Sequence, residues 1–192
     1  NLFSNETKNI NRVDFNKSFR IGGKKIGNEA KTFIIAEAGL NHNGSFQVAK
    51  KLIDNAKKSK CDAIKFQSFL PESRVSKKVK SEKYAEKIIG TQESINQLFL
   101  RLSLNFHTQK KIFKYGREKK ILIFSTPFDF ESADFLEKLN VCAYKIASAD
   151  LVNLPLIEHV AKKNKPLIIS TGMSTISEID EAVETVRSTG NK

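Results

Sequence analysis

Short apolar runs alternate along the chain with stretches whose apolar residues recur at helical spacing. Five runs have the composition of strands buried on both faces of a sheet. These predicted strands cover residues 33–39, 61–67, 121–126, 143–148 and 166–171. A helical pattern follows each of them. Repeated strand–helix units of this kind predict a parallel α/β sheet.

The helices carry their own start signals. Ser45 is placed to cap a helix over 46–58, and Thr175 with Glu178 forms a capping-box pattern before the last helix. The apolar spacing also predicts the remaining helices, which lie around 95–104, 108–120, 133–139 and 154–161.

Two segments lie outside the repeating units. We interpret residues 68–94 as an excursion above the sheet, and residues 1–20 as a flexible N-terminal arm. Residues 19–27 are predicted to form a small hairpin that turns at Gly22 and Gly23. Five strand–helix units fit either an open doubly wound sheet or a TIM barrel that lacks three of its eight units.

Composition excludes several classes of protein. The 192 residues include 40% hydrophobic and 28% charged residues, which is typical of a globular domain. No apolar run is long enough for a membrane helix, and no secretory signal is visible. Cys61 and Cys142 lack metal-ligand spacing, as expected in a reducing, cytoplasmic setting.

The chain carries 33 basic and 21 acidic residues, a formal net charge of +12. The excess lysines are scattered over predicted helices between apolar positions, so we interpret them mainly as solvated helix faces. No basic stripe interleaved with aromatic residues is present, and no nucleic-acid partner is expected. Nucleic-acid binding through bulk charge remains a competing hypothesis, which a steeply salt-dependent interaction would support.

Each predicted strand ends in polar residues that a buried run should not contain. They are Glu37, Lys65 and Gln67, Ser125 and Thr126, Lys145 and Ser148, and Ser170 and Thr171. Parallel α/β proteins bind their ligands at the carboxyl ends of the strands. The pattern therefore predicts a functional site at this edge.

Lys65 and Lys145 are the most unusual of these residues, because an isolated ammonium group in a buried strand loses its hydration. Each lysine could pair with a carboxylate such as Glu37 or Asp150. Alternatively, the two cations could converge on a small polyanion, or one could form a Schiff base. Glu37 should stay ionised and could orient water, a substrate hydroxyl or a metal.

The histidines give a weaker signal. His42 lies in a predicted turn, Asn41-His42-Asn43-Gly44, and is more typical of a loop histidine than of a catalytic one. His107 and His159 flank predicted helices, and we interpret them as structural. Three scattered histidines do not indicate a metal site.

Five segments in fixed order and spacing closely resemble the sialic acid synthase family, which includes N-acetylneuraminate, pseudaminate and legionaminate synthases. The segments are FIIAEAGLNHNGS (33–45), DAIKFQ (62–67), FSTPFD (124–129), AYKIASAD (143–150) and KPLIISTGMS (165–174). The resemblance implies a (β/α)8 TIM barrel, of which about five βα units are present, with residues 21–192 forming a partial synthase domain.

The resemblance also implies an activity, namely the condensation of phosphoenolpyruvate with an N-acylated amino sugar. Family positions match Glu37, Lys65, Lys145 and Asp150 as catalytic residues. They match a substrate-binding set of Lys65, Gln67, Thr126, Phe128, Lys145 and Ser148. The expected cofactor is a divalent metal, Mn²⁺ or Mg²⁺, and the complete enzyme is expected to be a homodimer.

Parts of the family pattern are missing from this sequence. The family's metal-binding histidines come from later strands and its antifreeze-like domain follows them, so we expect no metal ligand here and interpret the chain as a fragment that is inactive alone. An open sheet edge after 166–171 would be a pairing hazard. A Schiff-base aldolase and a non-catalytic truncated barrel that binds anions remain alternatives.

Overall fold

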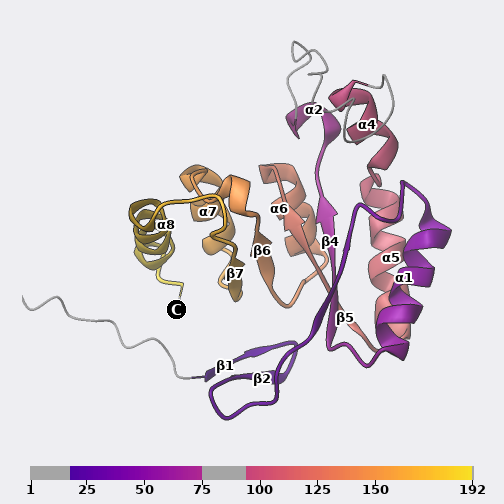
Figure 1. Cartoon of the computed structure of the whole chain (residues 1–192), viewed down its shortest axis with the longest axis horizontal. Helices are drawn as coiled ribbons and strands as arrows, with labels where there is room; N and C mark the ends of the chain where they lie inside the picture. Colours follow the sequence, from indigo (N-terminus) through magenta and orange to yellow (C-terminus); the bar gives the residue numbers. More distant parts are fainter. Residues whose placement is uncertain (1–17, 75–93, 192) are drawn as a thin grey trace, which may run out of the picture.

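The structure is a computed structural model that describes residues 18–74 and 94–191. Its centre is a parallel sheet of five strands (Figure 1). The strands are β3 (Ile35–Gly39), β4 (Ala63–Ser68), β5 (Leu122–Pro127), β6 (Tyr144–Ile146) and β7 (Leu167–Ile169). They follow one another across the sheet in sequence order.

The helices of the described ranges are α1 (Phe46–Lys58), α2 (Pro71–Arg74), α4 (Ile95–Leu102), α5 (Phe106–Glu118), α6 (Phe130–Lys138), α7 (Leu154–Ala161) and α8 (Ile176–Ser188). Helices α1, α5, α6, α7 and α8 form a layer beside the sheet, whereas α2 and α4 lie above the end of β4 (Figure 1). Helix α1 contacts α5, α6 contacts α7, and α7 contacts α8. Phe106 of α5 stacks on Phe135 of α6 with ring centroids 4.2 Å apart, which joins the two halves of the layer.

This arrangement decides between the two predicted architectures. A doubly wound sheet reverses its strand order at a switch point and carries helices on both faces. Here the strand order never reverses, and neighbouring helices follow the same order, as in a TIM barrel. The prediction of a partial (β/α)8 barrel with five βα units is confirmed.

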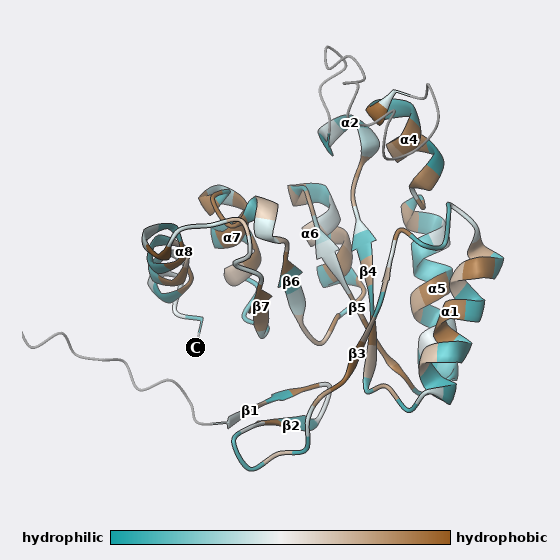
Figure 2. Ribbon diagram, in the orientation of Figure 1, coloured by the Kyte–Doolittle hydropathy of each residue, from teal (hydrophilic) through white to brown (hydrophobic). Residues whose placement is uncertain are grey.

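The core lies between the sheet and the helices. Ile112, Leu136 and Tyr144 are buried there, and most of β4 is buried as well. Figure 2 shows β4 changing from hydrophobic to hydrophilic at its arrowhead, which is its carboxyl end. The polar residues therefore gather where the strands end. Within the described ranges, no helix is long and apolar enough to cross a membrane.

A hairpin covers the opposite end of the sheet. Strands β1 (Ser18–Ile21) and β2 (Lys24–Gly27) pair antiparallel. Gly22 and Gly23 both have positive φ, 55° and 85°, as a two-residue type I′ turn requires. The predicted hairpin is confirmed. Residues 18–20, at the end of the predicted arm, belong to β1, whereas residues 1–17 lie outside the described chain, as do residues 75–93 of the predicted excursion.

Capping residues in the sequence predicted the starts of two helices correctly. The Ser45 side chain accepts a hydrogen bond from the backbone N–H of Val48, and Thr175 and Glu178 form the predicted capping box. The last two strands are shorter than predicted. Ser148 lies in a 3-10 turn, η1 (Ser148–Asp150), because the chain turns directly after β6 and pairs with its own backbone.

Candidate active site

Strand register brings the predicted site residues together at the carboxyl ends of the strands. Glu37 of β3 lies opposite Lys65 of β4, and Gln67 of β4 lies opposite Thr126 of β5. Because side chains alternate along a strand, Lys65 and Gln67 point to the same face of β4. The sequence pattern therefore located a real cluster of polar groups.

Lys65 is held by two neighbours. Its side chain is 10% exposed, and its Nζ lies 2.8 Å from Glu37 Oε2. The ammonium group also donates a hydrogen bond to Thr126 Oγ1 at 3.1 Å. The predicted alternative, an ion pair with Glu37, is thus present. The Glu37 side chain is 54% exposed, so its carboxylate also faces solvent.

Lys145 has only neutral hydrogen-bond partners. Its Nζ donates to the Ile146 carbonyl oxygen at 2.6 Å and to Ser170 Oγ. Within residues 18–74 and 94–191, no ion pair joins Lys145 to a carboxylate. Burial lowers the pKa of Lys145, the positive charge of Lys65 lowers it further, and the carboxylate of Glu37 opposes both effects.

The two lysines therefore share the field of one carboxylate. Each ammonium group is partly or largely buried, and in a buried environment an excess of positive charge is energetically unfavourable. An anion that enters this edge would gain two charge-assisted contacts and relieve the repulsion between the ammonium groups. The geometry favours an anion-binding site over two independent ion pairs.

A second cluster surrounds Arg74 at the end of α2. Its guanidinium carbon lies 3.6 Å from the ring centroid of Phe128, and it also stacks over Phe69 and Phe99 at 4.8 Å and 4.4 Å. The Arg74 Nη1 donates to Gln67 Oε1 at 3.5 Å. Burial lowers the pKa of Arg74 to about 10, although nearby carboxylates oppose the shift.

Asp150 completes this cluster from the other side. Its Oδ2 atom is buried and has no hydrogen-bond partner among the described residues. Burial raises the pKa of Asp150, while the positive charge of Arg74 lowers it. Ser148 begins the same turn. A partly buried carboxyl group with an unused oxygen is suited to accept a proton from a hydroxyl group or water.

Two residues with contacts in these clusters received no role from the sequence. Ser170 was visible as a polar strand end, but its contact with Lys145 depends on the register of β6 and β7. Arg74 gave no sequence signal, because its three aromatic partners come from distant segments.

The histidines lie outside both clusters. His42 is in the turn after β3 but is only 1% exposed, and its Nδ1 accepts the N–H of Gly44 at 3.1 Å. His159 Nε2 lies 2.6 Å from Asp134 Oδ1 between α7 and α6, consistent with a structural role. In the described part of the chain, no three His, Cys, Asp or Glu residues gather as a metal site.

Comparison with known proteins gives consistent matches. The NeuB family model matches residues 52–192. The chain is 44% identical over 174 residues to an uncharacterised protein of Methanocaldococcus jannaschii, MJ1065. This alignment covers 91% of this chain. It is 42% identical over 162 residues to N,N'-diacetyllegionaminic acid synthase of Campylobacter jejuni, across 84% of this chain.

A solved structure agrees with these relatives. The N-acetylneuraminic acid synthetase of Leptospira borgpetersenii, crystallised with citrate, has a TM-score of 0.77 and 32% identity. The alignment covers 91% of this chain and 56% of that one. The chain spans about half the length of the curated relatives it matches, with 48% of each of the two relatives covered.

Proposed function

This chain belongs to the NeuB family, and we propose from this premise that it carries the phosphoenolpyruvate-binding part of a nonulosonic acid synthase active site. The acceptor would be an N-acylated amino sugar, either N-acetylmannosamine or a related 2,4-diacetamido hexose. One observation carries the proposal: two ammonium groups at one sheet edge, on Lys65 and Lys145, share a single carboxylate.

Phosphoenolpyruvate suits this edge because it combines a phosphate and a carboxylate in a small molecule. Lys65 and Lys145 would bind these anionic oxygens through charge-assisted hydrogen bonds. Hydroxyl groups of Thr126, Ser148 and Ser170 would add neutral donors. Gln67 and Phe128 lie at the same edge beside Arg74, where the sugar would be held.

The proposed reaction forms one carbon–carbon bond and breaks one carbon–oxygen bond. C3 of phosphoenolpyruvate attacks the aldehyde carbon of the open-chain sugar, and the aldehyde oxygen takes a proton to become a hydroxyl group. Water then adds to the cationic C2 and loses a proton. The tetrahedral intermediate expels phosphate together with the bridging oxygen, and the oxygen from water remains as the ketone.

Two carboxyl groups are placed to assist the water step. Glu37 is ion-paired with Lys65 and also faces solvent, so it would orient a water molecule or a substrate hydroxyl. Asp150 has a buried oxygen without a partner in the described structure and a raised pKa. A carboxyl group of this kind would take up the proton that the attacking water releases.

A divalent metal, Mn²⁺ or Mg²⁺, and a homodimer belong to this proposal only for the longer protein. The residues described here do not fit a complete metal site, since no three candidate ligands gather among them. A metal would therefore take most of its ligands from outside the described residues. None of the steps above relies on it.

Calorimetric titration of the chain with phosphoenolpyruvate tests the proposal. Replacing Lys145 by glutamine should weaken binding about 10- to 100-fold, because one charge-assisted hydrogen bond is lost. Lys110→Gln is the matched control, because Lys110 is exposed on α5 and its replacement removes the same charge outside the two polar clusters. Unchanged affinity in Lys145→Gln, with the control also unchanged, would exclude Lys145 as a ligand.

A Schiff-base aldolase is a second candidate, and one observation favours it. Burial and the neighbouring Lys65 lower the pKa of Lys145, which increases the fraction of neutral amine available as a nucleophile. Borohydride reduction in the presence of pyruvate would then attach a covalent adduct to Lys145. The synthase proposal predicts no such adduct, and mass spectrometry of the tryptic peptide distinguishes the two.

A further inference from the structure

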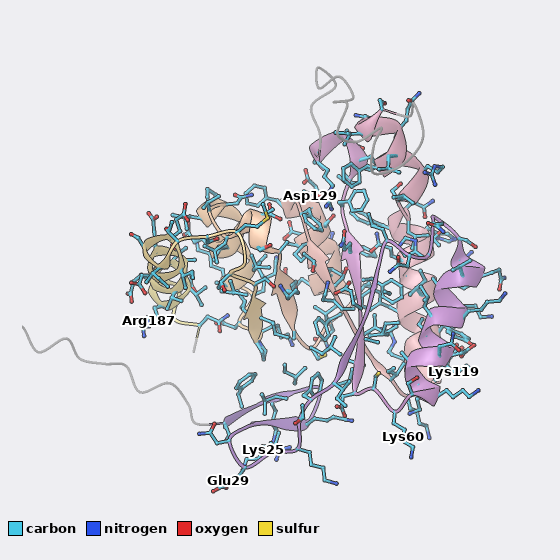
Figure 3. The ribbon with its side chains drawn as sticks, in the orientation of Figure 1. Lys25, Glu29, Lys60, Lys119, Asp129 and Arg187 are labelled. Carbon is cyan, nitrogen blue, oxygen red and sulfur yellow. The ribbon has the colours of Figure 1, made fainter. Side chains whose placement is uncertain are left out.

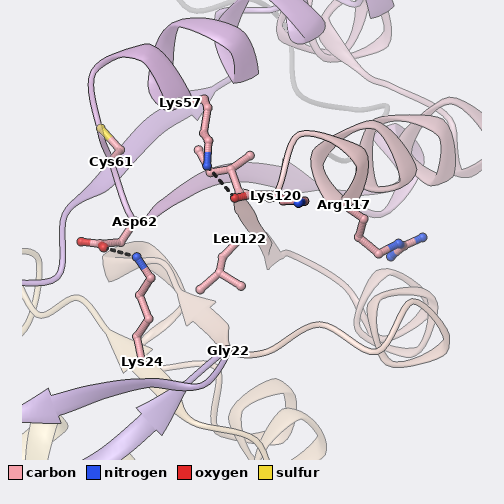
Figure 4. Close-up of a pocket in the computed structure, with 9 residues that line it drawn as sticks. Gly22, Lys24, Lys57, Cys61, Asp62, Arg117, Lys120 and Leu122 are labelled. Carbon is pink, nitrogen blue, oxygen red and sulfur yellow. Dashed lines mark hydrogen bonds and ion pairs between the residues drawn. The ribbon is translucent and has the colours of Figure 1, made fainter.

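A pocket of about 410 Å³ opens at the end of the sheet opposite to Lys65 and Lys145 (Figure 4). Its walls come from the β1–β2 hairpin, the carboxyl ends of α1 and α5, and the amino ends of β4 and β5. The volume is in the range of pockets that hold small organic ligands. Nothing in the proposed reaction uses this end of the sheet.

The lining of the pocket is strongly basic. Four cationic side chains line it against one carboxylate, so its formal charge is 4 − 1 = +3. The cations are Lys24, Lys57, Arg117 and Lys120, and the carboxylate is Asp62. Figure 3 labels Lys60 at the same end of the molecule, but this lysine does not belong to the lining.

Both oxygens of the carboxylate in the lining already have partners. Asp62 Oδ1 pairs with Lys24 Nζ at 2.5 Å, and Asp62 Oδ2 accepts the backbone N–H of Ile34 at 2.7 Å. The backbone hydrogen bond and Lys24 both lower the pKa of Asp62, so the carboxylate stays ionised and neutralises only Lys24.

The other cations have no such neutralisation. Lys57 Nζ donates to the backbone carbonyl oxygen of Lys120 at 2.9 Å, and this acceptor is neutral. Across the described ranges, no ion pair links Lys57, Arg117 or Lys120 to a carboxylate. Figure 4 shows Lys57 and Lys24 on two sides of the space beside Leu122, which gives the pocket an apolar wall between its charges.

The backbone at Lys120 offers a way to test the role of this lysine. Lys120 follows α5 with φ 54°, a left-handed conformation that favours glycine or asparagine over lysine. The equivalent turns after α6 and α7 hold Asn140 and Asn164, both at φ 52°, whereas the turn after α1 holds a second lysine, Lys60, at φ 60°. A lysine at this position makes the folded chain less stable than an asparagine would. The Lys120 side chain also lines the pocket and contributes a positive charge to it.

We propose that this pocket binds a small organic phosphate. Lys57 and Lys120 would contact the phosphate oxygens, Arg117 would add to the positive potential, and Leu122 would contact the organic part. A phosphate fits better than a single carboxylate, because several cations without a carboxylate partner call for more than one negative charge. The ligand would join the hairpin to the helix ends, beneath the strands that carry Lys65 and Thr126.

Nuclear magnetic resonance titration of the chain with ribose 5-phosphate, and separately with adenosine diphosphate, tests this site. Backbone amide shifts are expected at Gly22 and at residues 120–122. Lys120→Asn should weaken binding at least about fivefold, since one nearby charge is removed. The same variant should raise the melting temperature, because asparagine tolerates the left-handed backbone better.

Lys60→Asn is the matched control. Lys60 has φ 60° in the equivalent turn after α1, but it does not line the pocket. This variant should also raise the melting temperature while leaving the affinity for both phosphates unchanged. Lys145→Gln should leave this affinity unchanged too, which separates the site from the proposed active site.

Three outcomes would overturn the inference. The first is the absence of shifts around residues 120–122 with either phosphate. The second is a set of shifts centred on Lys65 and Thr126 instead. The third is an equal loss of affinity in Lys60→Asn and Lys120→Asn, which would indicate bulk charge attraction. Stronger binding of adenosine diphosphate than of ribose 5-phosphate would support the site and identify a nucleotide as the better ligand.

Discussion

Replacement of Gly44 by alanine is expected to destabilise the chain by about 4 kcal/mol, which combines two costs. Gly44 has φ +71°, where an alanine loses stability on backbone grounds alone. A methyl group there would also overlap the backbone carbonyl oxygen of Arg101. Because that oxygen belongs to the main chain, it cannot rotate away, and the loop or α4 must shift.

Gly23→Ala separates the two costs. Gly23 has φ +85° in the hairpin turn, and nothing lies within 4 Å of an added Cβ. This variant should lose only about 1 kcal/mol, the backbone cost alone. Urea unfolding followed by circular dichroism measures both variants. Equal losses would show that the loop around Gly44 moves freely and that the contact with Arg101 contributes nothing.

The Gly44 turn matters for the site because of its position in the chain. It follows β3, which carries Glu37, and its N–H donates to the buried ring of His42. A displaced Gly44 would break that hydrogen bond and loosen the carboxyl end of β3. If the chain binds phosphoenolpyruvate as proposed, Gly44→Ala should weaken that binding as well, even though Gly44 belongs to neither polar cluster.

The sequence predicted those parts of the fold that depend on local pattern. Apolar runs located all five strands, and turn or capping residues located the hairpin and the start of α8. The exact ends of β6 and β7 were harder to predict from the sequence, because strand ends depend on pairing partners elsewhere in the chain. Strand order, which distinguishes the barrel from the doubly wound sheet, required the structure.

The candidate site also contains residues that the sequence predicted and contacts that it could not predict. Lys65 and Lys145 stood out because charged residues are rare in buried strands, and the structure places both at one edge. The cage around Arg74 could not be predicted, because it joins residues from the loop after β4, from α4 and from the loop after β5. The charged pocket at the other end likewise joins a hairpin to two helix ends. Contacts between distant segments leave no periodic signal in a sequence.

His42 illustrates the limit most clearly and leads to the second large prediction. Its turn was predicted from Asn and Gly residues, but a turn histidine would ordinarily be exposed. Here the ring is buried and packs against Phe66 with centroids 6.0 Å apart. Burial lowers the pKa of His42 to about 4, from an ordinary value of 6.5.

The folded state should therefore hold His42 neutral where the unfolded chain protonates it. Between pH 6.5 and pH 4, the unfolded state binds more protons, so stability falls as the pH is lowered. The loss should total about 3 kcal/mol at pH 4, at roughly 1.4 kcal/mol per pH unit. Urea unfolding at pH 7 and pH 4.5 measures most of this change.

His42→Asn isolates the effect, because asparagine can still accept the Gly44 N–H but does not titrate near neutral pH. The variant should lose less stability than the unmodified chain between pH 7 and pH 4.5, even if its stability at pH 7 is lower. His107→Asn, at an exposed position on α5, is the control and should follow the unmodified chain. If His42→Asn also follows it, then the buried ring is protonated as readily as a free histidine. The Gly44 N–H would then face a protonated Nδ1, so the turn would have to open to accommodate the charge.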